Sequence, residues 1–310
     1  MGEEKQYCSG RVAVVTGAGR GIGRAHALAF AAAGASVVVN DLGVSYSGEK
    51  ERISPADEVV DEIRKGGGQA VANYCDVAEW AGAQALLETA LQAFGKVDIL
   101  VNNAAIIRPD ALIQTREADF DEVVRVNLKG TFCPSRAFAE HWVNRAQAGS
   151  LVEASIICTT SRVGLHGTPF YLVYGCTKAA VAYFVESSAA ELQQYGIRVN
   201  GVAPRADTRM MGDATRRLAQ VAGGAGVKAV FDALKSALPK ADERMDPASI
   251  SPLVVWLASD CSKAVNGKVF SVMTGRIGLH EGWREIGHVQ LPSSHTVEHV
   301  AREIPALLAK

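Results

Sequence analysis

The sequence predicts an α/β fold in which one doubly wound parallel sheet carries helices on both faces. Short runs rich in β-branched and apolar residues alternate with longer runs rich in Ala, Leu, Glu, Gln and Lys. Strands that are apolar on both faces are typical of a parallel sheet that is covered on each side. A glycine-rich turn also follows the first apolar run. This combination predicts a Rossmann-like sheet of about seven strands.

The predicted elements follow one another along the chain without a repeat or a low-complexity linker. The apolar runs predicted as strands cover residues 12–17, 36–41, 70–75, 96–103, 151–161, 196–204 and 266–272. The runs of helical composition cover residues 24–33, 55–65, 83–94, 117–146 and 177–195. We therefore predict a single domain over residues 1–279.

Two segments stand apart from this alternation. Residues 205–246 follow the sixth predicted strand, and their pattern predicts two short amphipathic helices joined by a glycine-rich turn. This segment is a candidate substrate lid. Residues 280–310 form a predicted helical tail, because Val297, Val300 and Ile304 recur at helical spacing.

Composition excludes several classes of protein. The 32 Lys and Arg residues are balanced by 33 Asp and Glu residues, so the protein has no strong positive electrostatic field that would attract nucleic acid. The polar first residues and the absence of a long apolar run argue against secretion and membrane insertion. Six cysteines without a C-x-x-C pair indicate neither a zinc site nor a disulfide framework. We therefore expect a cytoplasmic protein that binds no metal.

The turn TGAGRGIG, residues 16–23, connects the first predicted strand to a helix. Gly17, Gly21 and Gly23 allow positive φ or close backbone approach, and the amides at a helix start attract a pyrophosphate. A tight turn that needs glycine only for packing explains the pattern equally well. A second signal is needed to decide between a turn that binds a pyrophosphate and a turn that needs glycine only for packing.

That signal is Asp41, which lies 18 residues beyond Gly23 at the end of the second predicted strand. A carboxylate there accepts a hydrogen bond from the ribose 2′-OH of NAD and repels the 2′-phosphate of NADP. Arg20 favours NADP instead, and we give Asp41 more weight. Asp76 follows the third strand, where it contacts adenine or caps a helix ahead of Val77.

Three further residues indicate acid–base chemistry. Tyr174 and Lys178 are four residues apart at the start of a predicted helix, so their side chains share one face. A phenol has a pKa of about 10, and a nearby ammonium is expected to lower it. Ser161 lies 13 residues before Tyr174 at the end of the fifth strand, where an open parallel sheet places its ligand crevice.

These motifs together resemble the short-chain dehydrogenase/reductase family over residues 11–275. The glycine turn, the run NNA at 102–104, Asn127 in VRVNLKG, Ser161 and YGCTK at 174–178 match in order and spacing. The resemblance implies that Tyr174 is the acid/base and that Lys178 also holds the nicotinamide ribose. It implies that Ser161 binds the substrate oxygen and that Asn127 orders a water in a proton relay.

The glycine turn, Asp41 and the resemblance together imply a set of NAD contacts. These are Gly17, Arg20, Gly21, Ile22, Gly23, Asp41, Asp76, Val77, Asn103, Ala104, Ala105, Tyr174, Lys178, Pro204 and Thr208. Two positions depart from the family pattern: Ala105 replaces a glycine, and Arg205 replaces the glycine after Pro204. We expect Arg205 to turn into solvent and Thr208 to contact the nicotinamide carboxamide.

Within the family, the chain is similar to the (3R)-hydroxyacyl-CoA dehydrogenase unit of peroxisomal multifunctional enzymes and its bacterial relatives. The strings VVVNDLG, EVVDEIRKGGGQAVANY, SPLVVWLAS and NGKVFSVMTGRIG carry this likeness. It implies hydride transfer between NAD(H) and a bulky apolar secondary alcohol or ketone, with a 3-hydroxyacyl-CoA first and a hydroxysteroid second. The alternatives are an NADPH-dependent ketoacyl reductase and a catalytically silent cofactor-sensing or scaffolding protein. The resemblance also implies a homo-oligomer, a tetramer or possibly a dimer, joined through the helices at 117–146 and 177–195.

Overall fold

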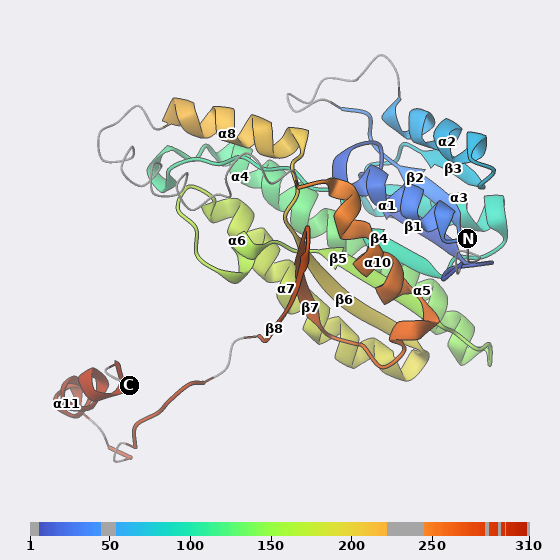
Figure 1. Ribbon diagram of the computed structural model, residues 1–310. Helices are drawn as coiled ribbons and strands as arrows, with labels where there is room; N and C mark the ends of the chain where they lie inside the picture. Colours follow the sequence, from blue (N-terminus) through green and yellow to red (C-terminus); the bar gives the residue numbers. More distant parts are fainter. Residues whose placement is uncertain are drawn as a thin grey trace. The chain divides into compact units, whose positions relative to one another are not determined.

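Eight strands form one sheet in the order β3-β2-β1-β4-β5-β6-β7-β8 (Figure 1). The computed structural model describes residues 6–44, 54–221, 245–282, 285–290, 293–294 and 296–308. The chain divides into the units Met1–His280, which contains the sheet, and Glu281–Lys310.

The first seven strands are parallel and correspond to the seven predicted runs. Their bounds are β1 Val12–Thr16, β2 Ser36–Asn40, β3 Ala70–Asn73, β4 Ile99–Asn102, β5 Ala154–Thr159, β6 Ile197–Pro204 and β7 Val269–Met273. The predicted fold class is therefore confirmed. The sheet has one more strand than expected, because β8 (Arg276–His280) pairs antiparallel with β7. No residue of β8 is fully buried, so it lacks the apolar run that identifies the others.

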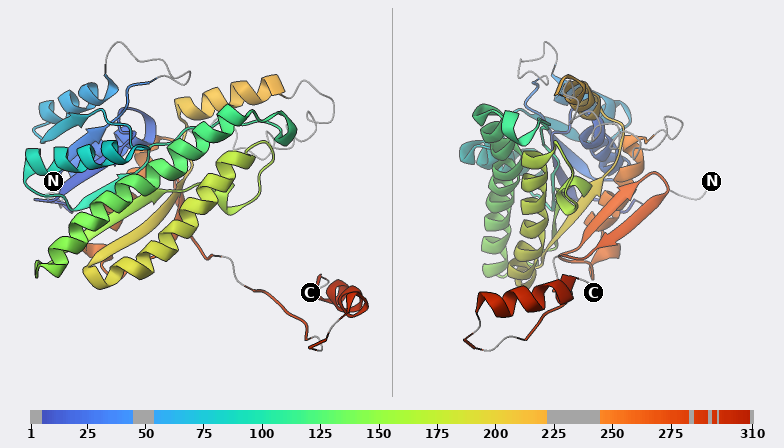
Figure 2. Two further views of the ribbon diagram at one scale, coloured as in Figure 1. Left: turned by 180° about the vertical axis from the view of Figure 1, so that it is seen from behind. Right: turned by 90° about the vertical axis from the view of Figure 1, so that its left-hand side faces the viewer.

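Helices cover both faces of the sheet (Figure 2). Their bounds are α1 Gly21–Ala32, α2 Pro55–Lys65, α3 Trp80–Phe94, α4 Glu117–Val124, α5 Gly130–Gln147, α6 Arg162–Leu165, α7 Leu172–Leu192, α8 Arg209–Val221 and α10 Ser251–Ala258. Two predicted boundaries were wrong. The helix predicted at 117–146 is interrupted by a π-helical turn at Arg125–Lys129, and α7 begins five residues before 177. The sequence carries no signal for the π-turn.

The core consists of two apolar layers on opposite faces of the sheet. Residues of α1, α2 and α10 pack on one face, against Ala13 and Val15 of β1. Residues of α3, α5 and α7 pack on the other face, against Val12 and Val14. Alternate residues of one strand thus enter opposite layers, as strand geometry requires. Burial of each valine contributes roughly 1.5 to 3 kcal/mol.

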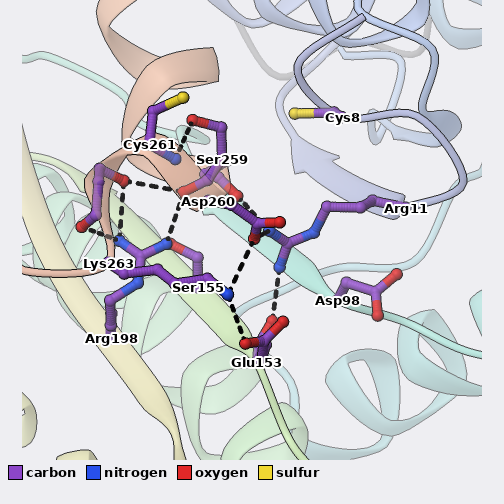
Figure 3. Close-up of polar contacts among 12 residues, drawn as sticks. Cys8, Arg11, Asp98, Glu153, Ser155, Arg198, Ser259, Asp260, Cys261 and Lys263 are labelled. Carbon is purple, nitrogen blue, oxygen red and sulfur yellow. Dashed lines mark hydrogen bonds and ion pairs between the residues drawn. The ribbon is translucent and has the colours of Figure 1, made fainter.

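Two arginines stabilise the edge of the sheet at the amino ends of the strands (Figure 3). Arg11, next to β1, donates to the Ala258 carbonyl at 2.6 Å and to the Glu153 carbonyl at 2.5 Å. Arg198 of β6 donates to the Leu257 carbonyl at 2.8 Å and to the Ser262 carbonyl at 3.2 Å. Carbonyls at the end of a helix lack partners within the helix. The guanidinium groups therefore cap the carboxyl end of α10.

The lid and the tail are described only in part. α8 is the first of the two helices expected in the lid, whereas the glycine-rich turn and the second expected helix fall within residues 222–244, outside the described residues. In the tail unit, α11 spans Val297–Leu308, where apolar spacing predicted a helix. Within the described parts of the chain, no helix has the length and apolar character needed to cross a bilayer.

Candidate active site

The glycine turn between β1 and α1 is shaped by backbone contacts. Gly17 and Gly21 have positive φ, at 60° and 53°. A Cβ on Gly23 would lie 2.2 Å from the Gly17 carbonyl oxygen. The first turn of α1 contains no acidic residue, and no side chain caps it. The amides of this helix start can therefore receive an anion such as a pyrophosphate.

Asp41 is held against the glycine turn. Its Oδ2 accepts a hydrogen bond from the Gly19 amide at 2.9 Å, and its Oδ1 accepts one from the Gly43 amide at 2.9 Å. A Cβ on Gly19 would lie 2.5 Å from Pro55 Cβ and 2.8 Å from Asp41 Oδ2. Sequence analysis missed Gly19, because the need for glycine there arises from residues more than 20 positions away. Each carboxylate oxygen retains a lone pair for a ribose hydroxyl.

The segment after β4 closes onto the same turn. Thr16 Oγ1 accepts hydrogen bonds from the amides of Asn103 and Ala104, both at 3.0 Å. Asn103 Nδ2 donates to the Thr16 carbonyl at 2.9 Å. A Cβ on Gly17 would lie 2.8 Å from Ala104 Cα. The structure thus brings three of the expected cofactor contacts together from two strands.

Asp76 does not cap α3, which begins at Trp80 with no side-chain cap, so the N-cap alternative was wrong. Its Oδ1 accepts from the Ala78 amide at 2.9 Å, and its Oδ2 pairs with Arg125 at 2.7 Å. Hydrogen bonding to Glu122 and then to Asp76 raises the pKa of Arg125. Val77 is buried and packs into the core. Both carboxylate oxygens of Asp76 therefore already have protein partners.

The segment after β6 also reaches the glycine turn. A Cβ on Gly21 would lie 3.5 Å from Thr208 Cγ2, so Thr208 is close to the start of α1. Pro204 ends β6, and the Arg205 amide donates to the Val272 carbonyl at 2.9 Å. The Arg205 side chain is half-buried rather than extended into solvent, so the expectation for this side chain was wrong.

Ser161, Tyr174 and Lys178 meet at the carboxyl ends of β5 and β6. Lys178 is almost fully buried, and its Nζ donates to the Thr159 carbonyl at 2.7 Å. This Nζ lies 5.8 Å from the centroid of the Tyr174 ring. Ser161 caps α6 by accepting from the Val163 amide at 3.2 Å, and its hydroxyl also forms a hydrogen bond with Tyr174. The constellation predicted from three separate positions is therefore assembled.

The electrostatics of this group differ from the sequence-based expectation. Burial raises the pKa of Tyr174 to about 12, and the Ser161 hydrogen bond opposes this shift. Burial also lowers the pKa of Lys178 to about 8. We expected the ammonium to lower the pKa of the phenol, and this was wrong for the protein alone. The free-energy cost of removing the phenolate from water exceeds the stabilisation that the Ser161 hydrogen bond provides.

Asn127 sits in the π-helical turn and is fully buried. Its Oδ1 accepts from the Ile106 amide at 2.8 Å, and its Nδ2 donates to the Ile106 carbonyl at 3.0 Å and to Thr177 Oγ1 at 3.2 Å. Asn127 thus joins the segment after β4 to α7, next to Lys178. A π-turn inside a helix often marks a functional site.

Comparison with known proteins decides the family. The family model described as short chain dehydrogenase matches residues 11–219. The chain belongs to this family. The chain is 36% identical over 281 residues to peroxisomal multifunctional enzyme type 2 of Mus musculus, covering 90% of this chain and 34% of that protein. It is 35% identical over 277 residues to hydroxyacyl-CoA dehydrogenase ChsB1 of Mycobacterium tuberculosis, covering 87% of this chain and 80% of that protein.

A solved structure agrees with this assignment. The crystal structure of a short chain dehydrogenase from Mycobacterium paratuberculosis bound to NAD is 30% identical, with a TM-score of 0.77, and the alignment covers 87% of this chain and 98% of that chain. The expected likeness to the multifunctional enzymes is confirmed. The chain spans about a third of the length of the mouse multifunctional enzyme.

One further residue of the candidate site was not predicted from the sequence. Gly164 lies in α6, and a Cβ there would lie 2.6 Å from the Ala179 amide nitrogen and 2.7 Å from Lys178 Cβ. Glycine at this position lets α6 pack against α7, which keeps Ser161 close to Lys178. The position of Gly164 relative to Ser161 can be read from the sequence. Its close contact with Lys178 and Ala179, which requires glycine, cannot.

Proposed function

We propose that the protein is an NAD-dependent dehydrogenase that acts on a bulky, largely apolar secondary alcohol, with a 3-hydroxyacyl-CoA as the first candidate and a hydroxysteroid as the second. The observation that carries this proposal is the hydrogen-bonded pair of Ser161 and Tyr174 beside the buried Lys178. A scaffolding or sensing protein needs no such pair. The name of the Mycobacterium tuberculosis relative, a hydroxyacyl-CoA dehydrogenase, supports the first candidate.

The three side chains have separate tasks in the proposed reaction. The Ser161 hydroxyl donates to the substrate oxygen and holds it beside Tyr174. Tyr174 is neutral at physiological pH, since its pKa is raised to about 12, so it already carries the proton that a ketone oxygen receives on reduction. In the oxidation direction it must first lose this proton. Lys178 uses one of its three donors on Thr159, which leaves two for the nicotinamide ribose. Bound NAD supplies the hydride acceptor.

We propose that Asn127 serves the same reaction. Its amide holds Ile106 and Thr177 in place, and the family resemblance assigns it to a proton relay through an ordered water. Loss of activity in Asn127→Ala with unchanged NADH affinity would support that role. A parallel loss of stability and NADH affinity would limit Asn127 to a structural role.

We propose NAD rather than NADP because of Asp41. Its carboxylate is fixed over the glycine turn by two amides, where it would repel a 2′-phosphate. Asp41→Ser is expected to shift the ratio of kcat/KM for NAD to that for NADP toward NADP by at least tenfold, with Asp57→Ser as the control. If the parent enzyme already prefers NADP, Arg20 outweighs Asp41 and the proposal fails.

The proposed substrate class rests on apolar side chains at the substrate side. Leu112, Leu172 and Met211 are exposed large hydrophobic residues, and they belong to the segment after β4, to α7 and to α8. We propose that residues 205–246 act as a lid over this surface. The test compares kcat/KM for short polyols, 3-hydroxyacyl-CoAs of increasing length and hydroxysteroids. A preference for polyols would overturn the substrate class and leave the family unaffected.

We propose a homo-oligomer, a tetramer in the first instance. Trp80, Phe132 and Phe184 form an aromatic strip across α3, α5 and α7, with ring centroids 6.2 and 6.3 Å apart. Arg136 covers the Trp80 ring at 4.8 Å. Trp80 and Phe132 are exposed, and such aromatic surfaces are enriched at interfaces. A monomer in light scattering at micromolar concentration would contradict this proposal.

We propose a reducing compartment, the cytoplasm, as the location. All six cysteines are free thiols in the structure, and intracellular proteins generally keep their thiols reduced. Fractionation of the source cells tests this proposal, and recovery of the protein from an oxidising compartment would refute it.

A further inference from the structure

Charged groups attach α8 to the body of the protein. α8 runs beside α4 in the views of Figures 1 and 2. Arg217 of α8 donates to Asp119 of α4 at 2.9 Å and to Asp110 at 3.3 Å. The side chains of Arg217, Asp110 and Asp119 are 20%, 12% and 10% exposed. Charged hydrogen bonds with this little solvent contact are stronger than surface ion pairs.

Asp110 also contacts a second segment. Its backbone N–H donates to the Phe170 carbonyl at 2.8 Å, and its Oδ1 accepts from the Ala111 amide at 2.9 Å. Phe170 lies between Ser161 and Tyr174, the two residues that exchange a hydrogen bond at the reaction centre. One residue of the segment after β4 therefore connects the lid helix to the loop that leads to Tyr174.

Phe170 has an unusual backbone conformation. Among the residues that the structure describes, it alone combines a side chain with a positive φ, at 68°. This conformation is disfavoured for a bulky residue and persists only where the surroundings hold it. The Asp110 amide is a contact that holds it. α7 begins two residues later at Leu172, so the orientation of the first turn of α7 depends on this contact.

We propose that Asp110 and Arg217 are positioning residues that determine how the enzyme discriminates between long and short acyl chains, an inference that rests on the proposed function. The three segments that Asp110 connects carry exposed apolar side chains: Leu112 and Ile113 beside Asp110, Leu172 in α7, and Met211 in α8. A long acyl chain must contact this apolar surface, whereas a short one ends before it. The link between Asp110 and Arg217 fixes the relative positions of these side chains.

The ion pairs of Asp119 show whether Arg217→Met or Asp110→Asn is the more direct test of the link. It also pairs with Arg116 at 2.7 Å, and hydrogen bonding to Arg116 and Arg217 lowers the pKa of Asp119 to about 2. The carboxylate therefore stays charged at physiological pH and retains Arg217 when Asp110 is neutralised. Arg217→Met removes both pairs, so its effect should exceed that of Asp110→Asn.

The kinetic test compares Arg217→Met with Arg216→Met. Arg216 is the neighbouring residue of α8, its side chain is 73% exposed, and among the described residues it pairs with Asp213. For Arg217→Met we expect kcat/KM for a long-chain 3-hydroxyacyl-CoA to fall about tenfold and that for 3-hydroxybutyryl-CoA to change less than twofold. NADH affinity should be unchanged, and Arg217→Lys should recover part of the loss. An equal loss for both chain lengths would overturn the proposal.

A second measurement needs no substrate. Hydrogen exchange is followed in residues 209–221 and in residues 108–114, which contain the Asp110 amide. We expect both segments to exchange faster in Arg217→Met and neither in Arg216→Met. Faster exchange in residues 209–221 alone would refute the coupling. If the parent protein oxidises neither CoA ester, the proposed function fails, while the exchange result still decides whether the link exists.

Discussion

At the amino ends of the strands, Arg11 and Arg198 donate to backbone carbonyls at the end of α10 and are surrounded by acceptors (Figure 3). At the carboxyl ends, Asn102 Oδ1 and Thr160 Oγ1 are buried without a hydrogen-bond partner among the described residues. Lys178 there retains two donors beyond Thr159. The two guanidinium groups at the amino edge are saturated by the protein, whereas Lys178 at the carboxyl edge keeps donors for a ligand. This difference implies that the amino edge contributes stability and the carboxyl edge contributes reactivity.

The strongest test of the comparison is Tyr174→Phe. We expect turnover to fall about 10³-fold or more, because the variant cannot exchange a proton with the substrate oxygen. NADH affinity and unfolding free energy should stay close to those of the parent. Tyr183→Phe, on the exposed side of the same helix, is the control. Near-normal turnover in Tyr174→Phe would remove Tyr174 from the mechanism.

The pH profile sharpens the same prediction. Since burial raises the pKa of Tyr174 to about 12, the phenolate is scarce at neutral pH and becomes about tenfold more abundant with each pH unit. The rate of alcohol oxidation should therefore rise between pH 6 and pH 8, while ketone reduction should not. Steady-state rates in both directions test this, and an oxidation rate that falls with pH would contradict it.

The next largest expected effect is a loss of cofactor affinity after a substitution in the glycine turn. Gly23→Ala places a Cβ 2.2 Å from the Gly17 carbonyl oxygen and 2.4 Å from Asn103 Nδ2, so the backbone of the turn must move. We expect NADH to bind at least 100-fold more weakly, as measured by fluorescence titration. Gly66→Ala, at an ordinary φ of −77°, should bind NADH normally. Unaltered affinity in a folded Gly23→Ala would show that the turn does not hold the cofactor.

At the amino edge, Arg198→Leu should change stability and leave the chemistry intact. Five acceptors of its guanidinium, including the carbonyls of Leu257 and Ser262, would lose this donor. The unfolding free energy should fall by about 2 to 3 kcal/mol, while kcat/KM per folded molecule is unchanged. Arg24→Leu removes only an exposed pair with Glu62 and should cost less than about 1 kcal/mol. Equal losses in urea unfolding would contradict the assignment.

The smallest effect concerns His26, which is buried and bonds Ser251 Oγ through Nδ1 at 2.9 Å. Burial lowers its pKa from 6.5 to about 3, so between these values the unfolded chain binds one more proton than the folded protein. Stability is therefore lost as pH falls below 6.5, by about 1.4 kcal/mol per pH unit.

Urea unfolding at pH 7.0 and pH 5.5 measures this loss. The difference in unfolding free energy between the two pH values should be about 1 kcal/mol smaller in His26→Gln than in the parent. In the control His166→Gln, at an exposed histidine, this difference in unfolding free energy should be the same as in the parent. If the parent and His26→Gln lose the same amount, the buried imidazole is not responsible.

Much of the fold and of the site could be predicted from local pattern. The seven parallel strands, the glycine turn and the order of Ser161, Tyr174 and Lys178 are each visible within a few residues of sequence, because periodicity, positive φ and helical spacing are local constraints. Gly19, Gly164 and β8 were missed. The two glycines depend on neighbours distant in sequence, Asp41 for Gly19 and Lys178 for Gly164, whereas β8 pairs with the adjacent β7 but lacks an apolar run.

Long-range packing decides the remaining properties. Whether Asp76 faces a ligand or Arg125 depends on a residue 49 positions away, and the contact between Asp110 and Arg217 spans 107 positions. The pKa of Tyr174 depends on how completely the assembled elements exclude water, a quantity that no short stretch of sequence contains. The spacing of residues along the chain determines which chemical groups lie at the crevice, and the burial of these groups determines their protonation state. The two are separate because side-chain identity is encoded residue by residue, whereas solvation belongs to the whole packed surface around a group.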